Sequence, residues 1–142
     1  MALSRQEIER IRKVYAAFNR ADLEAVLQEF DEDTEFIAPA EMPEQRRFRG
    51  REGYREFLAS IFDVFEEFRS EPKRILEAGG GRYLVFLVEH FRRKGDTAVV
   101  VEHAYAIITM KDGRVRRLEI LADRRDALRA AGLSEEDVPV NR

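Results

Sequence analysis

Apolar side chains recur at spacings of three and four residues in the first half of the chain, which is the period of a helix with one buried face. From about residue 70 onward the period changes to two, which is typical of strands. The pattern predicts helices at about 5–18, 23–30, 51–65 and 123–131, and strands at about 34–38, 73–78, 82–92, 97–110 and 114–122. Because glycine-rich turns separate the last four strands, we expect a meander of antiparallel hairpins there.

End signals mark several of these elements. Ser4 and Glu7 have the spacing of a capping box, which predicts that the first helix begins at about residue 5. Asp22 and Asp123 are placed to cap the second and the last helix, and Gly132 is placed to end the last one. The prolines and charges between residues 39 and 49 predict a loop.

The order of elements, α-α-β-α-β-β-β-β-α, predicts the fold class. Helices that precede one long antiparallel sheet favour an α+β fold in which the curved sheet wraps around a long helix and leaves a pocket at its mouth. The composition does not change along the 142 residues, so we expect a single domain over residues 1–142, with its core at about 4–133 and a polar tail at 134–142.

The composition argues against several classes of function. The chain has no cysteine and two histidines, which excludes thiol chemistry, so we expect neither a metal nor another cofactor. Its 25 Lys and Arg residues are balanced by 28 Asp and Glu residues, so no overall basic charge recruits nucleic acid. No apolar run approaches the ~20 residues that span a bilayer, and we expect a cytoplasmic protein without membrane contact.

Three segments carry a resemblance to a known superfamily. The run VYAAFNRADL at residues 14–23 resembles the opening of nuclear transport factor 2-like proteins, and so does FRGREG at residues 48–53. The ending, with KDGRV at 111–115 and residues 123–133, is similar to the SnoaL-like branch, which is named for polyketide cyclases. The resemblance implies a cone-shaped α+β fold with a mainly hydrophobic pocket between the third helix and the sheet.

The resemblance also implies where catalytic groups would lie. Tyr15 matches the position at which ketosteroid isomerases carry an oxyanion-hole tyrosine on the first helix. Ala38 and Tyr105 stand at or near the positions of two aspartates in those enzymes, and Ile120 stands near the last-strand aspartate of the epoxide hydrolases. The chain therefore lacks the catalytic acids of both groups.

The period of two divides each predicted strand into two faces. One face carries no acid, whereas the other carries Glu35, Glu89, Glu102 and Glu119. Because burying an unpaired carboxylate costs several kcal/mol, we expect the acid-free face to line the concave side. The predicted ligand pocket then contains Phe36, Ala38, Phe57, Ile61, Phe86, Val88, His90, Ile107, Leu118 and Ile120.

Few groups on the acid-free face can exchange a proton. The candidate catalytic residues are His103 as base, with the hydroxyl of Tyr15 or Tyr105 as donor to a carbonyl or enolate oxygen. They favour a cofactor-free isomerase or cyclase acting on an apolar, carbonyl-bearing small molecule. The alternative is a non-catalytic ligand-binding or dimerisation module, which the missing acids favour. A register slip of one residue would exchange His103 for Glu102, and Ile120 for Glu119, in the pocket.

The acid-bearing face predicts a protein partner. It is too apolar to face water on a monomer, which favours a homodimer through the convex sheet face. Relatives in the superfamily commonly dimerise in this way. The apolar residues assigned to this face are Val85, Leu87, Phe91, Ala104, Ala106 and Ile108.

Overall fold

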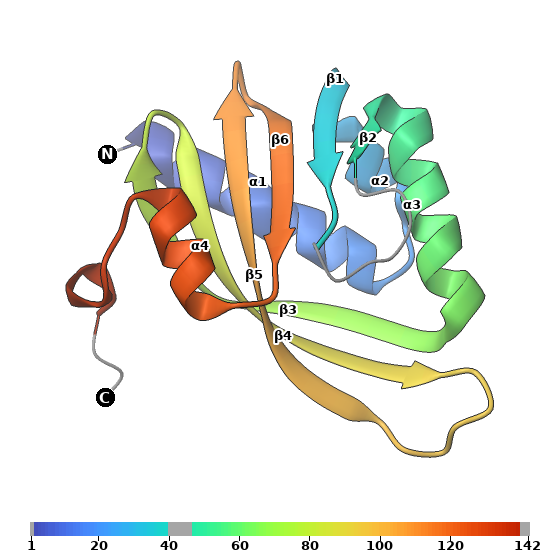
Figure 1. Cartoon of the computed structure of the whole chain (residues 1–142). Helices are drawn as coiled ribbons and strands as arrows, with labels where there is room; N and C mark the ends of the chain where they lie inside the picture. Colours follow the sequence, from blue (N-terminus) through green and yellow to red (C-terminus); the bar gives the residue numbers. More distant parts are fainter. Residues whose placement is uncertain (1, 40–46, 140–142) are drawn as a thin grey trace.

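The computed structural model describes residues 2–39 and 47–139, which form a curved, open six-stranded sheet with helices packed on it (Figure 1). The helices are α1 (Ala2–Asn19), α2 (Leu23–Gln28), α3 (Gly50–Val64), α4 (Arg124–Ala131) and the short 3-10 helix η1 (Glu135–Asp137). The strands are β1 (Phe30–Ile37), β2 (Arg47–Arg49), β3 (Phe65–Gly79), β4 (Arg82–Arg93), β5 (Val100–Lys111) and β6 (Arg114–Leu121). The predicted α+β fold is confirmed.

Two strands depart from the predicted elements. The strand β3 begins at Phe65, directly after α3, although its alternation of side chains is clear only from about Ser70. The end of the predicted loop forms the short strand β2, in which Phe48 pairs with Phe36 of β1. Residues 40–46 of that loop lie outside the described residues.

Asp caps begin two of the helices, as predicted. An Asp22 carboxylate oxygen accepts a hydrogen bond from the Ala25 N–H at 3.2 Å, and the Asp123 carboxylate accepts one from the Asp126 N–H at 2.9 Å. Gly132 ends α4 with a left-handed φ of 74°. Local sequence therefore sets these helix boundaries.

The predicted capping box at the start of α1 is wrong. The helix begins at Ala2, so Ser4 and Glu7 lie within it and face the sheet. The Ser4 hydroxyl donates to Glu77 Oε2 on β3 at 2.6 Å, and the Tyr83 hydroxyl on β4 donates to the buried Glu7 carboxylate. These residues join α1 to the sheet instead of capping it.

The sheet has the strand order β2-β1-β6-β5-β4-β3. Neighbouring strands are antiparallel except for β1 and β6, which run parallel with Phe36 opposite Leu118, so the sheet is mixed where a wholly antiparallel one was predicted. The helices α1 and α3 lie on one side of this sheet and α4 on the other (Figure 1). The concave side is therefore enclosed by α1 and α3.

A β-bulge in β6 decides which side chains face the interior. The β5–β6 hairpin begins in regular pairing, with Met110 opposite Val115. One pair later Thr109 lies opposite Arg117, so Arg116 is an extra residue in β6. Side chains alternate between the two sides of a strand, so one extra residue in β6 moves all later side chains of β6 to the opposite side relative to β5.

The bulge overturns the predicted faces of β4 and β5. Ile108 lies opposite Leu118, whereas in a hairpin without the bulge Ile107 would lie opposite Leu118. The acid-bearing face of β4 and β5 therefore lines the concave side together with the acid-free face of β1 and β6. The prediction that the acid-free face of all four strands is concave is wrong for β4 and β5.

Two apolar clusters follow from this arrangement. The larger fills the space between the sheet, α1 and α3. The smaller lies on the convex side, where Leu84, Tyr105 and Ile107 pack against Leu128 of α4. The residues predicted as an exposed convex patch are buried on the concave side, namely Val85, Leu87, Phe91, Ala104, Ala106 and Ile108. The patch that suggested a homodimer is thus absent from the convex face, and the homodimer itself stays a prediction.

None of the helices in the described residues combines the length and apolar character required to cross a membrane.

Gly81 offers a test of the β3–β4 turn. Its φ is +75°, and a Cβ atom there would lie 2.7 Å from the Met110 carbonyl oxygen, whereas Gly80, at φ +66°, faces open space. We expect Gly81→Ala to lower the free energy of unfolding by roughly 2–4 kcal/mol, since backbone strain and the clash add, and Gly80→Ala to lower it by about 1 kcal/mol from strain alone. Urea unfolding of both variants measures the difference, and equal losses would contradict this account.

Candidate functional site

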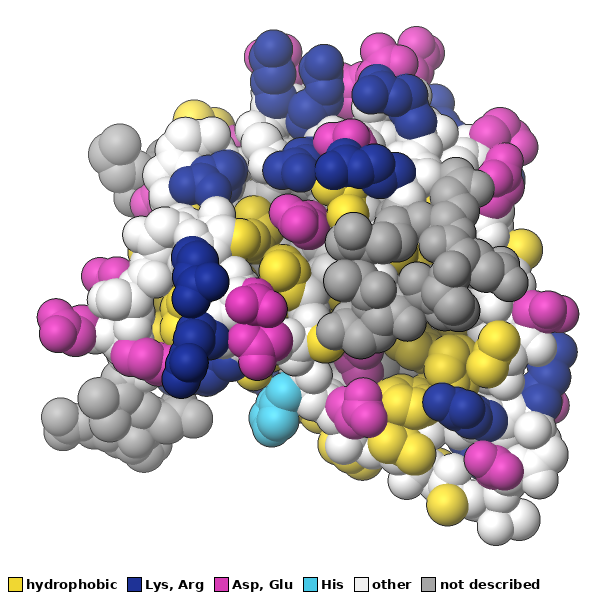
Figure 2. Space-filling view, in the orientation of Figure 1, with side chains coloured by type: hydrophobic (Ala, Val, Ile, Leu, Met, Phe, Trp, Pro, Cys, Tyr) yellow, Lys and Arg dark blue, Asp and Glu magenta, His cyan; other side chains and the backbone are white. Residues whose placement is uncertain are grey.

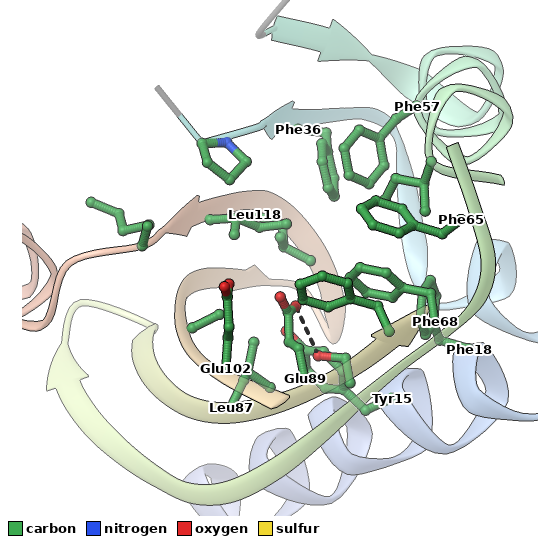
Figure 3. A pocket seen from close by; sticks show the side chains of 18 of the residues that line it. Tyr15, Phe18, Phe36, Phe57, Phe65, Phe68, Leu87, Glu89, Glu102 and Leu118 are labelled. Atoms are coloured by element: carbon green, nitrogen blue, oxygen red, sulfur yellow. Dashed lines mark hydrogen bonds between the residues drawn. The ribbon is translucent and has the colours of Figure 1, made fainter. Parts of the chain in front are cut away.

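A cavity of about 500 Å³ lies between the concave face of the sheet, α1 and α3. This volume falls within the range of about 300–1,000 Å³ that is typical of small-molecule sites. Figure 3 shows side chains from these elements converging on the cavity. Eight aromatic residues line it: Tyr15, Phe18, Phe36, Tyr54, Phe57, Phe65, Phe68 and Phe91.

The aromatic rings form a packed wall. The ring centroids of Phe36 and Phe57 are 4.3 Å apart, and those of Phe65 and Phe91 are 5.0 Å apart. Such contacts fix the orientation of each ring, so the wall presents a preformed apolar surface. The space-filling view shows hydrophobic side chains on the surface between α3 and the ends of β4 and β5 that are joined by the β4–β5 turn (Figure 2). These three elements supply Val64, Arg93 and His103, which lie at the rim of the cavity.

One carboxyl group lies in this apolar setting. Glu89, from β4, is partly buried, and the Ser70 hydroxyl of β3 donates to its Oε2 atom at 3.4 Å (Figure 3). Burial raises the pKa of Glu89 to about 7, the hydrogen bond from Ser70 opposes the rise, and the charge of Glu102 adds to it. Glu89 therefore exchanges its proton near neutral pH, which an ordinary glutamate does not.

Tyr15 brings a hydroxyl group to the same region from α1. Burial raises the pKa of Tyr15 far above its ordinary value, and the neighbouring Glu89 and Tyr54 add to the rise. The hydroxyl thus stays protonated over the whole working range of a protein. Within residues 2–39 and 47–139 it has no hydrogen-bond partner, and the side chain lines the cavity. A ligand can accept its proton.

Asn19 holds the Ser70 backbone in place at the end of α1. The Asn19 Nδ2 group donates to the Ser70 carbonyl at 2.8 Å, and the Ser70 N–H donates to Asn19 Oδ1 at 2.9 Å. This pair of bonds fastens β3 to α1 directly behind Glu89. The position of the Ser70 hydroxyl therefore depends on Asn19.

Loss of these two bonds has a measurable cost. We expect Asn19→Ala to lower the free energy of unfolding by about 1–3 kcal/mol, because it leaves the backbone groups of the mostly buried Ser70 without their partners. Gln28→Ala, the loss of an exposed amide side chain, is the matched control and should change stability by less than about 0.5 kcal/mol. Urea unfolding compares the two variants, and a similar effect of both would show that the Asn19 bonds contribute nothing particular.

The structure distributes the sequence-predicted site residues over four places: the rim of the cavity, the core, the cavity lining and the convex side of the sheet. His103 is exposed and lies at the rim of the cavity. Ala38 is buried in the core next to the cavity. The following predicted residues line the cavity: Tyr15, Phe36, Phe57, Ile61, Leu118 and Ile120. The following alternate onto the convex side, because of the bulge in β6: Phe86, Val88, His90, Tyr105 and Ile107.

The convex-side residues have structural contacts of their own. The rings of Tyr105 and Phe86 pack edge to face, with centroids 5.6 Å apart, under α4. His90 Nε2 lies 3.3 Å from a Glu71 carboxylate oxygen of β3. The prediction that Tyr105 and His90 face the concave side is therefore wrong. Polar cavity residues that the predicted pocket did not contain include Glu89, Ser70 and Glu102, of which Glu102 was expected there only in the case of a register slip.

Metal-ligating side chains do not gather in the described part of the chain: no three His, Asp or Glu residues there are placed to hold an ion. The expectation that the protein works without a cofactor stays a prediction.

The fold has many counterparts among solved structures. TerC, in a crystal structure with polyporic acid, is 26% identical, with a TM-score of 0.76 over 89% of this chain and 98% of TerC. A nuclear transport factor 2-like protein from Burkholderia pseudomallei, of unknown function, is 20% identical, with a TM-score of 0.76 over 87% of this chain and 95% of its own. A protein from Xanthomonas campestris assigned as a polyketide cyclase is 20% identical, with a TM-score of 0.67 over 89% and 97% of the two chains.

Sequence comparison defines the family. No significant match was found among curated proteins. The SnoaL-like domain family, in contrast, matches residues 11–118, most of the chain, and its span includes α3 and both carboxylates of the cavity. The chain belongs to the SnoaL-like domain family.

Proposed function

We propose that this protein binds an apolar, carbonyl-bearing small molecule in the cone cavity and transfers a proton on it through Glu89. The observation that carries the proposal is a carboxyl group with a pKa of about 7 beside a protonated tyrosine in an aromatic cavity. Perturbed acids of this kind in clefts are typical of proton-transfer sites. The prediction of an isomerase or cyclase is retained, with Glu89 replacing His103 as the group that exchanges the proton.

Each polar group has a distinct role in the proposed reaction. The apolar part of the ligand contacts the aromatic wall, and its carbonyl oxygen accepts a hydrogen bond from the Tyr15 hydroxyl. This bond stabilises negative charge that develops on the oxygen when a proton leaves the neighbouring carbon. Glu89 exchanges a proton with the ligand, and its pKa near neutrality suits this task. The Ser70 hydroxyl keeps the Glu89 carboxyl oriented.

The family supports binding of a small molecule by this fold. TerC was co-crystallized with polyporic acid, and it is similar to this chain over almost its whole length. An interior filled by side chains, the alternative expected for a dimerisation module, does not account for a cavity of about 500 Å³. Binding without turnover remains the competing outcome, and the experiment below separates it from catalysis.

The neutral aromatic ketone 2-tetralone is a suitable probe, because the hydrogens next to its carbonyl exchange with deuterium oxide through the enolate. We expect the protein to accelerate this exchange, followed by proton NMR, and Glu89→Gln to reduce the acceleration about 100-fold, in line with the usual contribution of acid–base catalysis. Glu119→Gln, the same change on the outward face of β6, is the control. Saturation binding of 2-tetralone without accelerated exchange would show a binding protein instead of an enzyme.

A further inference from the structure

The two carboxylates of the cavity are direct neighbours. Glu89 of β4 and Glu102 of β5 lie opposite each other in the antiparallel pairing, and both line the cavity. Opposite residues of such a pair have their Cβ atoms about 4.5–5.5 Å apart. Figure 3 shows both carboxyl groups directed into the same space. The backbone register sets the proximity of the two Cβ atoms, and the charge of Glu102 acts on the Glu89 carboxyl group.

Neither carboxylate has a cationic partner in the described residues. Glu89 bonds only to the Ser70 hydroxyl, and Glu102 forms no ion pair there. By contrast, Glu35, on the outward side of β1, pairs with Arg47 at 3.0 Å and with Arg117 at 3.1 Å. The negative charge of the outward Glu35 is thus balanced by arginine, whereas no cation balances the charges of Glu89 and Glu102 in the described residues.

Polar groups from four other elements line the cavity together with Glu89. Tyr15 of α1 and Tyr54 of α3 are uncharged, Ser70 of β3 donates its hydroxyl, and Glu102 of β5 supplies a second negative charge. The guanidinium of Arg93, on β4 itself, lies 6.0 Å from the Phe65 ring centroid and forms no ion pair with any residue of 2–39 or 47–139. Two adjacent like charges in an apolar cavity favour retention of one proton between them.

We propose that Glu89 and Glu102 work as a pair that holds one proton at neutral pH, with Glu89 as the acid and Glu102 as the base. The assignment follows from their environments. Glu89 is partly buried beside the Tyr15 ring, where a neutral carboxyl is favoured, while Glu102 is exposed, where water stabilises a carboxylate. This inference rests on the proposed function, because it concerns the same cavity and the same ligand.

The pair can carry out a balanced proton shift. The Glu102 carboxylate removes a proton from the carbon next to the ligand carbonyl, and the electron pair of that C–H bond forms the C=C bond of the enol. The Glu89 carboxyl gives its proton to the carbonyl oxygen, to which Tyr15 also donates a hydrogen bond. The ligand leaves as its enol, or regains a proton at another carbon, and the pair still holds one proton. No oxidant, reductant or additional reactant is required.

The first test measures the proton of the pair without any ligand. Carbon-13 NMR of protein labelled at the glutamate carboxyl carbons follows each group between pH 4 and 9. In Glu102→Gln we expect the pKa of Glu89 to fall by on the order of one pH unit, because the neighbouring charge is gone. Glu102→Ala should give the same shift, whereas the control Glu119→Gln should leave Glu89 unchanged. An unchanged Glu89 titration in both Glu102 variants would overturn the pair.

The second test concerns the role of Glu102 as base. In Glu102→Gln we expect 2-tetralone to bind as in the wild-type protein but to exchange its hydrogens about 100-fold more slowly, since the base is lost. Exchange that persists in Glu102→Gln but is lost in Glu89→Gln would leave the proposed function intact and refute the pair. Absence of exchange in the wild-type protein would instead refute the proposed function, while the NMR titration would still decide whether the two carboxylates share a proton.

Discussion

Replacement of Glu89 by Gln is expected to stabilise the folded protein at pH 8.5 by about 3 kcal/mol. Folding raises the pKa of this group from 4.5 to about 7, so the folded state binds its proton more tightly than the unfolded chain does. The contribution of Glu89 to stability is therefore fully present below about pH 4.5, where both states are protonated, and is lost as the pH rises through about 7. Glutamine resembles the neutral carboxyl at every pH and does not carry this penalty.

Urea unfolding of the wild-type protein and Glu89→Gln at several pH values between 4.5 and 8.5 measures the effect. The two stabilities should converge at the acidic end, diverge as the pH rises from about 4.5 to about 7, and differ by a nearly constant amount above that range. Glu119→Gln removes a carboxylate from the outward face, and its stability should change with pH nearly as that of the wild-type protein does. If the stability of Glu89→Gln does the same, Glu89 has an ordinary pKa and cannot be the proton-exchanging group.

Ala104→Phe is expected to weaken binding of an apolar probe by on the order of 100-fold. Ala104 is 6% exposed and lines the cavity in the middle of β5, so a phenyl ring there occupies space that the ligand needs. Excluding about 100 Å² of apolar ligand surface costs about 2.5 kcal/mol, which corresponds to this loss. N-phenyl-1-naphthylamine, which is neutral and fluoresces in apolar surroundings, is a convenient probe.

The matched control for this variant is Ala98→Phe, since Ala98 is exposed between β4 and β5 and does not line the cavity. Circular dichroism of both variants establishes that the fold is retained. Equal probe affinities for the wild-type protein and folded Ala104→Phe would place the probe outside the cone cavity. If the wild-type protein does not bind the probe, the result would favour the alternative of a dimerisation module whose interior is filled by side chains.

Local signals in the sequence predict most of the fold. The Asp caps, the left-handed glycine at 132 and the change of period from helix to strand act over a few residues, and the structure reproduces them. Phe57 and Ile61 of α3, which the sequence places in the pocket, likewise line the cavity, because residues spaced four apart share a helix face. The early start of β3 could not be read in this way, since its first residues do not alternate.

Which polar residues face the cavity depends on a shift of one residue in the pairing of β5 with β6. Val115 and Leu118 are separated by two arginines, and this break in the alternation was the available sign of a bulge. The bulge carries Glu89 and Glu102 inward, against the argument that burying carboxylates is too costly. That argument treats the acid as charged, whereas a carboxyl group in an apolar wall can keep its proton and avoid most of the cost.

The parallel pairing of β1 with β6 has a consequence for the order of folding. It joins Phe36 to Leu118, about eighty positions apart in the chain, whereas the hairpins of β3 to β6 join near neighbours. Closing so long a loop costs more conformational entropy than forming a hairpin, and pairings of this kind slow folding. We expect the hairpins to form first, and the cavity to acquire its α3 wall only when β1 docks on β6.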